Sequence, residues 1–273
     1  MRLRHLGRGI ERGFPVQNRR KRKKKKNMSE KKAVKEKNTK EKAAKEKNTK
    51  VKAAKETLDR QLEEKRGLAG EIIRRLELEY PDAGCTLDYN QAWKLLVSVR
   101  LAAQWTDARV NVVVQELYKK FPDVQALAQA DVDEIEEIVR PCGLGRSKAR
   151  DISACMKILW EEYGGNVPDD FELLLKLPGV GRKSANLIMG DVFGKPAIVT
   201  DTHCIRLVNR MGLVDQIKEP KKVEMELWKI IPPEKGSDFC HRLVYHGREV
   251  CTARTKPFCD RCCLADICRK IGV

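Results

Sequence analysis

A series of segments with apolar residues at helical spacing is the feature that most constrains this chain. The first, RQLEEKRGLAGEIIRRLELEY, begins at residue 60, and each segment is closed by Gly, Pro or a turn. Two runs rich in β-formers are too isolated to make a sheet, and strands do not alternate with helices. We therefore predict an all-α fold and disfavour a Rossmann-type or barrel enzyme. The further helical segments cover residues 91–104, 108–121, 131–140, 148–163 and 169–177, and the two β-rich runs cover residues 110–114 and 197–200.

The basic charge of the chain is concentrated at its N-terminus. The 273 residues carry a net charge of +17, and residues 1–56 account for all of it, with 23 basic and 6 acidic side chains. This segment contains KRKKKK (Lys21–Lys26) and two ten-residue repeats, EKNTKEKAAK and EKNTKVKAAK, which begin at Glu36 and Glu46. Because it has almost no apolar side chains, it cannot bury enough surface to offset its ordering entropy. We predict a disordered tail that attracts polyanions, with a solubilising tail that has no partner as the alternative.

The extreme N-terminus offers little else. Met28 is an alternative start of translation, and the Arg-rich first dozen residues weakly resemble an organelle transit peptide. There is no secretory signal and no apolar stretch approaching the roughly 18 residues of a membrane span. We therefore expect no membrane association.

The stretch KLPGVGRKSANLIMG (Lys176–Gly190) predicts a helix–hairpin–helix. Asp169 and Asp170 supply an acidic cap for a first helix, Pro178 to Gly181 form the turn, and a second helix runs from Arg182 to about Val192. The two glycines allow positive φ and close approach of another backbone. Exposed amides at the start of the second helix form a phosphate site. An ordinary α-hairpin turn is the alternative.

Lys183 is unusual because a cation is disfavoured in the first turn of a helix. The helix dipole and the exposed amides there destabilise the protonated amine, and a neutral amine is a nucleophile that can form a Schiff base. A solvated surface lysine is the alternative. Asp201, in VTDTHCIRLVNR, precedes another helical segment and is expected to be its N-cap. Its carboxylate could also assist amine chemistry near Lys183.

Ten cysteines are present, and half of them fall in the last 23 residues. Cys251, Cys259, Cys262 and Cys268 are separated by seven, two and five residues. Four thiolates at such spacing hold either tetrahedral zinc or a [4Fe–4S] cluster, and spacing alone does not choose between them. Disulfides are the alternative, against which the absence of a secretory signal argues.

Taken together, LPGVGRKSAN, VTDTHCIRLVNR, HGREVC and the cysteine array resemble endonuclease III, the helix–hairpin–helix family of DNA base-excision glycosylases that carries an iron–sulfur cluster. LAAQWTDARVN and GLGRSKA also match segments of that family. The resemblance extends from about residue 60 to Cys268. It implies two helical domains that flank the active-site cleft. One is a six-helix barrel containing the hairpin, in residues 85–195, and the other is a cluster domain made from both chain ends, in which an N-terminal helix in residues 57–84 joins residues 196–273.

Residue by residue, the resemblance implies that Lys183 is the nucleophile and Asp201 the assisting carboxylate of a bifunctional DNA glycosylase and AP lyase. Lys183 would attack C1′ of a flipped nucleotide that carries an oxidised or ring-damaged pyrimidine, and β-elimination would cut the strand 3′ to the lesion. The amides of Gly179, Val180 and Gly181 would hold the DNA backbone. Gln104 and Leu144 would fill the gap left by the flipped base.

The resemblance also implies that Cys251, Cys259, Cys262 and Cys268 ligate a [4Fe–4S] cluster. The family usually has six residues between its first two cluster cysteines, whereas TARTKPF has seven. Cys263 could replace its neighbour Cys262 as a ligand. The lysine-rich tail inherits nothing from the family.

Two other functions compete with the lyase. A monofunctional adenine glycosylase shares the fold and cluster, but that branch lacks a lysine at the position of Lys183. A non-catalytic DNA-binding module would require neither Lys183 nor Asp201. We expect a monomer that binds damaged or abasic double-stranded DNA, in the cytoplasm at the nucleoid of a prokaryote or in the nucleus or mitochondrion of a eukaryote.

Overall fold

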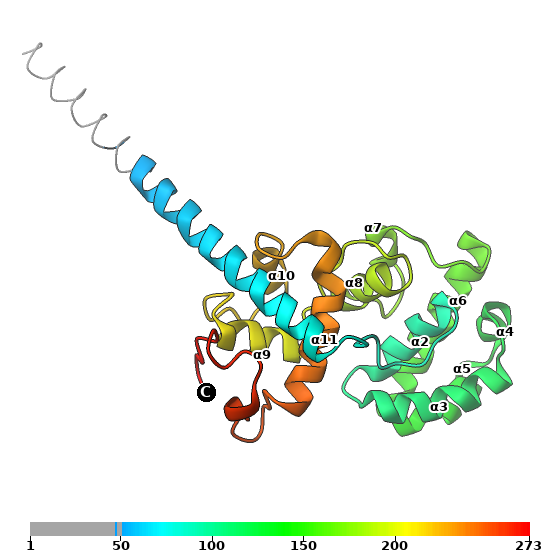
Figure 1. Ribbon diagram of the computed structural model, residues 1–273. Coiled ribbons are helices and arrows are strands. Elements are labelled where there is room, and N and C mark those ends of the chain that lie inside the picture. The colour runs from blue at the N-terminus through cyan, green and yellow to red at the C-terminus, as the bar shows by residue number, and fades with distance from the viewer. Residues whose placement is uncertain (1–46, 48–50) are drawn as a thin grey trace, which may run out of the picture. The chain divides into compact units, whose positions relative to one another are not determined.

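The computed structural model describes residue 47 and residues 51–273, and residues 61–273 form one compact unit. Every regular element in the described residues is helical (Figure 1), which confirms the all-α prediction. The predicted basic tail, residues 1–56, lies outside the described residues except for residue 47 and residues 51–56. Residues 51–79 are helical, so this helix begins before the predicted boundary at residue 57.

The remaining helices are short to medium in length, and three of them are single 3₁₀ turns. In chain order they are α2 (Ala92–Ala102), α3 (Asp107–Lys120), α4 (Val124–Gln129), α5 (Val132–Val139), η1 (Arg140–Cys142), α6 (Gly145–Tyr163), α7 (Phe171–Leu174), α8 (Arg182–Asp191), α9 (Thr202–Met211), α10 (Pro220–Leu227), η2 (Pro233–Lys235), α11 (Gly236–Glu249) and η3 (Cys259–Arg261).

Several boundaries differ from the predicted ones for local reasons. The β-rich run at residues 110–114 lies inside α3, because three of its four valines fall on the buried side of a helix whose remaining residues favour helix, while Val112 is exposed. The run at residues 197–200 is buried but is not a strand. The helix predicted at residues 169–177 is only Phe171–Leu174, since the chain leaves the helix in a turn before Pro178. The six-residue helix α4 is too short to show a periodic pattern and was not predicted.

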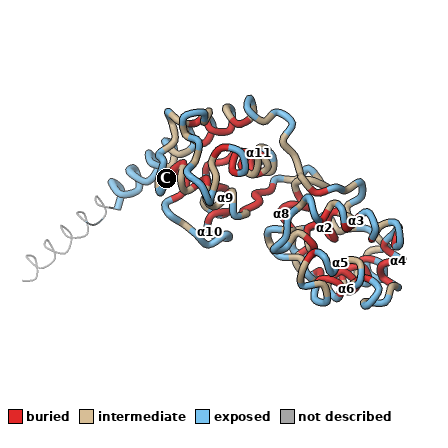
Figure 2. Tube along the Cα trace, turned by 90° about the horizontal axis from the view of Figure 1, so that it is seen from below, coloured by how far each residue is buried: buried red, intermediate tan, exposed pale blue. Residues whose placement is uncertain are grey.

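Two packing centres organise the compact unit. α6 packs against α4 and α5, and α11 packs against α9. Figure 2 shows buried stretches along α2, α6 and α11, where apolar side chains meet in one continuous core. Among the described residues, no helix combines the length and the apolar character that a membrane crossing requires.

The contact between α9 and α11 is unusually close at Gly247. A Cβ atom at this position would lie 2.5 Å from Nδ1 of His203 and 2.9 Å from Nη2 of Arg206. Arg206 instead donates to the Gly247 carbonyl at 3.0 Å. The missing side chain at Gly247 therefore lets α11 approach the beginning of α9, where Asp201 is located.

Candidate active site

The predicted helix–hairpin–helix is present as α7, a turn and α8. Asp170 caps α7, because its Oδ1 accepts a hydrogen bond from the Leu173 amide at 2.9 Å. The Val180 amide donates to the Leu177 carbonyl at 3.1 Å and closes the turn. The sequence signals for this motif, an acidic cap followed by a Pro-Gly turn, were therefore interpreted correctly.

The two glycines of the hairpin have different roles. Gly179 has φ +76°, and a Cβ atom there would lie 2.9 Å from Cδ of Arg100 and 3.0 Å from Cβ of Asp151. Arg100 and Asp151 form an ion pair, with Nε donating to Oδ2 at 2.7 Å. Gly181 instead has an extended φ of −97° and no atom within 4 Å of the place where its Cβ would be. Only Gly179 uses the left-handed conformation that the sequence allowed for both.

The start of α8 presents free backbone donors. No side chain caps this helix. Within the described part of the chain, the amides of Gly179 and Gly181 have no hydrogen-bond acceptor, whereas the Val180 amide is already used in the turn. The open space in front of Gly181 leaves these donors accessible, which is the arrangement that an anion such as a phosphate requires.

Lys183 and Asp201 line the same cavity, of about 390 Å³. Lys183 lies in the first turn of α8 and is exposed, and no carboxylate within the described residues forms an ion pair with it. Asp201 is the N-cap of α9, as predicted, with its Oδ1 accepting from the Cys204 amide at 2.7 Å. Its Oδ2 has no donor among the described residues. An unpaired lysine side chain and a carboxylate with an unpaired oxygen therefore line one cavity within the described residues.

This cavity is also lined by polar side chains that were not assigned roles from the sequence, among them Asp107, His203 and Arg248. Oδ2 of Asp107 accepts from Thr86 Oγ1 and from Arg248 Nη2, both at 2.6 Å. Burial acts to raise the pKa of Asp107, but these two hydrogen bonds outweigh it and lower the pKa below its ordinary value. Asp107 and Arg248 lie in LAAQWTDARVN and HGREVC, the segments on which the resemblance depended.

His203 lies beside Asp201 and is kept neutral by its surroundings. Burial lowers the pKa of its imidazole, and the cations Arg206, Arg248 and Lys183 act in the same direction, although Asp201 opposes them. A neutral imidazole adds no positive charge to a cavity that already contains Lys183.

Gln104 and Leu144 lie on two loops that contact each other. Both residues are exposed, and both have positive φ, +62° for Gln104 and +50° for Leu144. Gln104 lines the cavity that contains Lys183, whereas Leu144 does not. The two loops meet where the Trp105 ring covers Gly143, with ring carbons 3.7 Å from the place of a Cβ atom at Gly143.

The four predicted cluster cysteines line one cavity, which Cys263 does not line. Each of three sulfurs accepts a hydrogen bond: Cys251 from Arg210 Nη1 at 3.2 Å, Cys262 from the Leu264 amide at 3.4 Å, and Cys268 from the Lys270 amide at 3.4 Å. Such donors stabilise negative charge on sulfur. All ten cysteines, every one of them in the described residues, are free rather than disulfide-bonded.

The thiols are spread around this cavity and do not converge on one point. No three His, Cys, Asp or Glu side chains in the described residues are arranged to hold a single metal ion. Burial raises the pKa of the Cys262 and Cys268 thiols, so a positively charged centre is needed to deprotonate them at neutral pH. Four thiolates are the donor set of a [4Fe–4S] cluster, in which each iron takes one thiolate, and also of a tetrahedral zinc ion.

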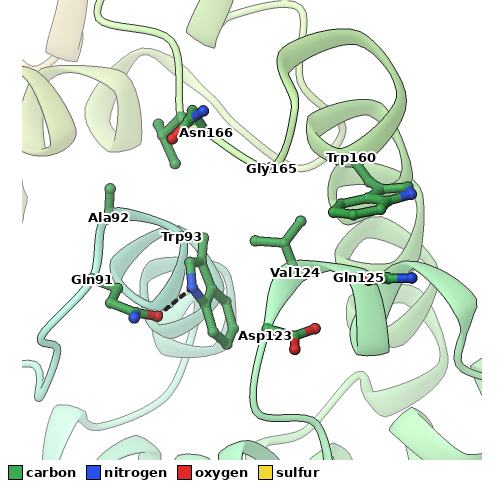
Figure 3. A pocket seen from close by; sticks show the side chains of 10 residues that line it. Gln91, Ala92, Trp93, Asp123, Val124, Gln125, Trp160, Gly165 and Asn166 are labelled. Carbon is green, nitrogen blue, oxygen red and sulfur yellow. Dashed lines mark hydrogen bonds between the residues drawn. The ribbon is translucent and has the colours of Figure 1, made fainter.

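A larger cavity, of about 560 Å³, lies elsewhere, between the beginnings of α2 and α4 and the end of α6. Figure 3 shows Trp93 and Trp160 at this cavity with Val124 between them in the view, and Trp93 Nε1 donates to Gln91 Oε1 at 2.6 Å. None of the residues predicted for catalysis, DNA binding or metal ligation lines it. Cavity volume alone therefore does not identify the active site of this chain.

Comparisons with known proteins bear on the family to which this chain belongs. The family model described as "HhH-GPD superfamily base excision DNA repair protein" matches residues 97–233. Endonuclease III of Synechocystis is 45% identical over 214 residues, which cover 78% of this chain and 96% of that protein. A solved structure of a non-covalent endonuclease III–DNA complex is 38% identical with a TM-score of 0.71 and covers 75% of this chain and 95% of that chain. A trapped covalent endonuclease III–DNA intermediate matches with the same identity and TM-score, covering 75% of this chain and 96% of that chain.

Proposed function

The chain belongs to the HhH-GPD superfamily of base excision DNA repair proteins, and from this premise we propose how its α7–α8 hairpin and the adjoining cavity act on DNA. The protein is a DNA glycosylase with AP lyase activity, of the endonuclease III type. Its proposed substrate is double-stranded DNA that contains oxidised or ring-damaged pyrimidines or abasic sites, and it acts as a monomer. The protein would act in the cytoplasm, at the nucleoid, in a prokaryote, and in the nucleus or the mitochondrion in a eukaryote.

Lys183 is the proposed nucleophile. Its amine attacks C1′ of the flipped nucleotide and forms a C–N bond, while the glycosidic bond breaks and the damaged base leaves with the bonding electrons and a proton. The nitrogen lone pair then expels O4′, which takes up a proton from water as the C1′–O4′ bond breaks, and a protonated Schiff base is left at C1′. This Schiff base acidifies the C2′ protons, and loss of one of them expels the 3′ phosphate by β-elimination. The observation that carries this assignment is that Lys183 and Asp201 line one cavity directly after the hairpin. A related enzyme has been trapped as a covalent DNA intermediate, which agrees with such a step.

Asp201 is the proposed assisting carboxylate. Its Oδ1 is used to cap α9, and its Oδ2 remains available to the cavity. A carboxylate at this position stabilises the positive charge that develops on the sugar as the base departs. The same oxygen can also exchange a proton with the Lys183 amine.

DNA is held by backbone donors and loop side chains in this proposal. The amides of Gly179 and Gly181 bind phosphate oxygens of the damaged strand, while Val180, whose amide is used within the turn, shapes the hairpin. Gln104 and Leu144 enter the duplex and occupy the gap left by the flipped nucleotide. Flipping is required because the reaction cannot reach a base within the stack.

Cys251, Cys259, Cys262 and Cys268 would hold a [4Fe–4S] cluster. When bound, it would crosslink the segment that follows α11 and so stabilise this end of the fold. The shared cavity and the hydrogen bonds to three of the sulfurs support these four thiols as the ligands, and the similarity to endonuclease III favours a cluster over zinc. Cys263 lies outside the cavity, and its carbonyl accepts a hydrogen bond from Arg75.

Product analysis on a duplex with a single thymine glycol tests the proposal. We expect wild-type protein to release the base and cut the strand 3′ to the lesion, and Lys183→Ala to do neither. Base release by the wild type without strand scission would instead indicate a monofunctional glycosylase. Binding without either product would indicate a damage-binding module and would overturn the assignment of Lys183.

A further inference from the structure

Lys148, the fourth residue of α6, is fully buried, with 0% of its surface exposed. Its ammonium group donates to three backbone carbonyls: those of Leu101 at 2.7 Å, Ala103 at 2.8 Å and Cys142 at 2.8 Å. An ammonium group has three N–H donors, so all of its hydrogen-bonding capacity is used. Within the described part of the chain no carboxylate pairs with it, which makes it a buried cation held by carbonyl oxygens alone.

The position of these carbonyls explains why a cation is stable there. Leu101 and Ala103 lie at the C-terminal end of α2, which ends at Ala102. The carbonyls of a helix's last turn have no partner within the helix and carry the negative end of its dipole. Lys148 satisfies two of them and, through the Cys142 carbonyl, connects α2 to the end of η1, just before the two residues that lead into α6.

The two connected segments are the ones that contain the proposed gap-filling residues. Ala103 directly precedes Gln104, and Cys142 lies two residues before Leu144. Gln104 and Leu144 are two of only four non-glycine residues with positive φ in the described chain. Left-handed backbone is uncommon in such residues and persists only where surrounding structure enforces it.

A second contact between the two loops lies at the surface. Trp105 covers Gly143, but the Trp105 side chain is 41% exposed, and its ring has the Arg109 guanidinium 5.8 Å from its centroid. Lys148 is therefore the buried connection between the loops. Because its three bonds are short and screened from water, they restrict both loops more than the surface contact does.

We propose that Lys148 is a positioning residue that holds the two loops in the conformation in which Gln104 and Leu144 can enter the duplex. This inference rests on the proposed function, because it assigns Lys148 a role only if those two side chains fill the gap. Preorganisation of this kind reduces the entropy that would otherwise be lost when the loops order on DNA. Lys148 touches neither the lesion nor Lys183 in this account.

The test compares Lys148→Met with the wild type on two substrates under single-turnover conditions. The first substrate has the lesion paired within a duplex, and the second has the same lesion in a one-nucleotide bulge, where no opposing base has to be separated. We expect Lys148→Met to excise the paired lesion slower by on the order of tenfold or more, and the bulged lesion at close to the wild-type rate. Lys157→Met, an exposed lysine of the same helix, is the matched control and should match the wild type on both.

Two further variants separate positioning from general damage to the fold. Lys148→Gln keeps two N–H donors and should recover part of the excision rate on the paired lesion. If Lys148→Met does not fold, Lys148→Gln is compared with the wild type on the same two substrates instead. In a Gln104→Ala/Leu144→Ala background, Lys148→Met should cause no further loss on the paired lesion, because it acts through those residues.

Equal loss on paired and bulged substrates, or no loss on either, would overturn the role of Lys148. An additive loss in the Gln104→Ala/Leu144→Ala background would do the same. A wild-type protein that excises neither lesion would contradict the proposed function itself. Failure of the proposed function can therefore be distinguished from failure of the role assigned to Lys148.

Discussion

The guanidinium of Arg182 donates two hydrogen bonds to the buried carboxylate of Glu224, from Nε at 2.6 Å and from Nη2 at 2.7 Å. Arg182 also lies over the Phe171 ring, with its guanidinium carbon 5.0 Å from the ring centroid. These contacts connect α7, α8 and α10 at the residue before the proposed nucleophile. The first turn of α8 is thereby fixed by contacts with α10 through Glu224 and with α7 through Phe171.

Arg182→Met should destabilise the protein substantially, because it leaves the buried Glu224 carboxylate without a charged partner and with only the 3.4 Å hydrogen bond from Trp228 Nε1. Glu224 is 1% exposed. We expect the free energy of unfolding to fall by roughly 3 kcal/mol, measured by urea denaturation. Arg150→Met, at an exposed arginine of α6, should stay within about 0.5 kcal/mol of the wild type. If both variants were equally stable, the ion pair would contribute nothing to the position of α8.

Substitutions of Asp201 should separate its capping role from its chemical role. Asp201→Asn keeps an oxygen that can accept from the Cys204 amide, so stability should change little, whereas base excision should be abolished because the charge is lost. Asp201→Ala should in addition lose about 1 kcal/mol of stability, the usual contribution of an N-cap. Thermal unfolding and single-turnover excision measure the two effects.

Asp123 provides the matched control for that pair, because its Oδ1 caps α4 by accepting from the Ala126 amide at 2.7 Å. Asp123→Ala should lose a similar amount of stability and retain excision activity. Full activity of Asp201→Asn would show that the carboxylate charge is not needed and that capping is its only function.

The Asp107–Arg248 pair should make stability depend on acid pH. The pKa of Asp107 is lowered in the folded protein, so its contribution is present above its ordinary value of 3.8 and is lost as the pH falls through the lowered value. Arg248→Met should therefore be less stable than the wild type by about 1 kcal/mol at pH 7, and the difference should shrink below pH 3.8.

Urea denaturation at several pH values checks this, with Arg254→Met, at an exposed arginine, as the control. A difference between Arg248→Met and the wild type that stayed constant down to the most acidic pH would contradict the account, because the carboxylate would then not be the partner that matters.

Removal of single cysteines should identify the cluster ligands. Cys262→Ser should lose most of its iron and acid-labile sulfide per chain, whereas Cys263→Ser should retain the wild-type amounts, because only Cys262 lines the cavity with the other three thiols. Iron and sulfide determination on purified protein checks this. The reverse pattern would assign Cys263 as the ligand, and the presence of zinc without sulfide would exclude the cluster.

Local signals in the sequence were sufficient to predict the hairpin, the N-cap at Asp201 and the four cysteines that line one cavity. Each of them depends on neighbouring residues: a Pro-Gly turn between capped helices, an acidic residue before a helical run, and thiols at ligand spacing. Lys183 and Asp201 were singled out from their places at the starts of two helices, whereas Gln104 and Leu144 came from the resemblance alone, and the roles of all four remain proposals.

Contacts between distant residues could not be predicted in the same way. Asp107 and Arg248 are 141 positions apart, and no local sequence pattern around either residue predicts that the two side chains form an ion pair. The acceptors of Lys148 are backbone carbonyls, which every residue possesses, so no side-chain pattern encodes them. The shortened α7 and the short α4 depend on tertiary packing that overrides local preference.

Borohydride trapping on a duplex that contains an abasic site or a thymine glycol tests the central claim, that Lys183 forms a Schiff base with DNA. Wild-type protein should give a covalent protein–DNA band, as should Lys176→Ala, which removes an exposed lysine on the other side of the hairpin. Lys183→Ala should give no band. A band that persists in Lys183→Ala, or its absence from folded wild-type protein on both substrates, would contradict the assignment.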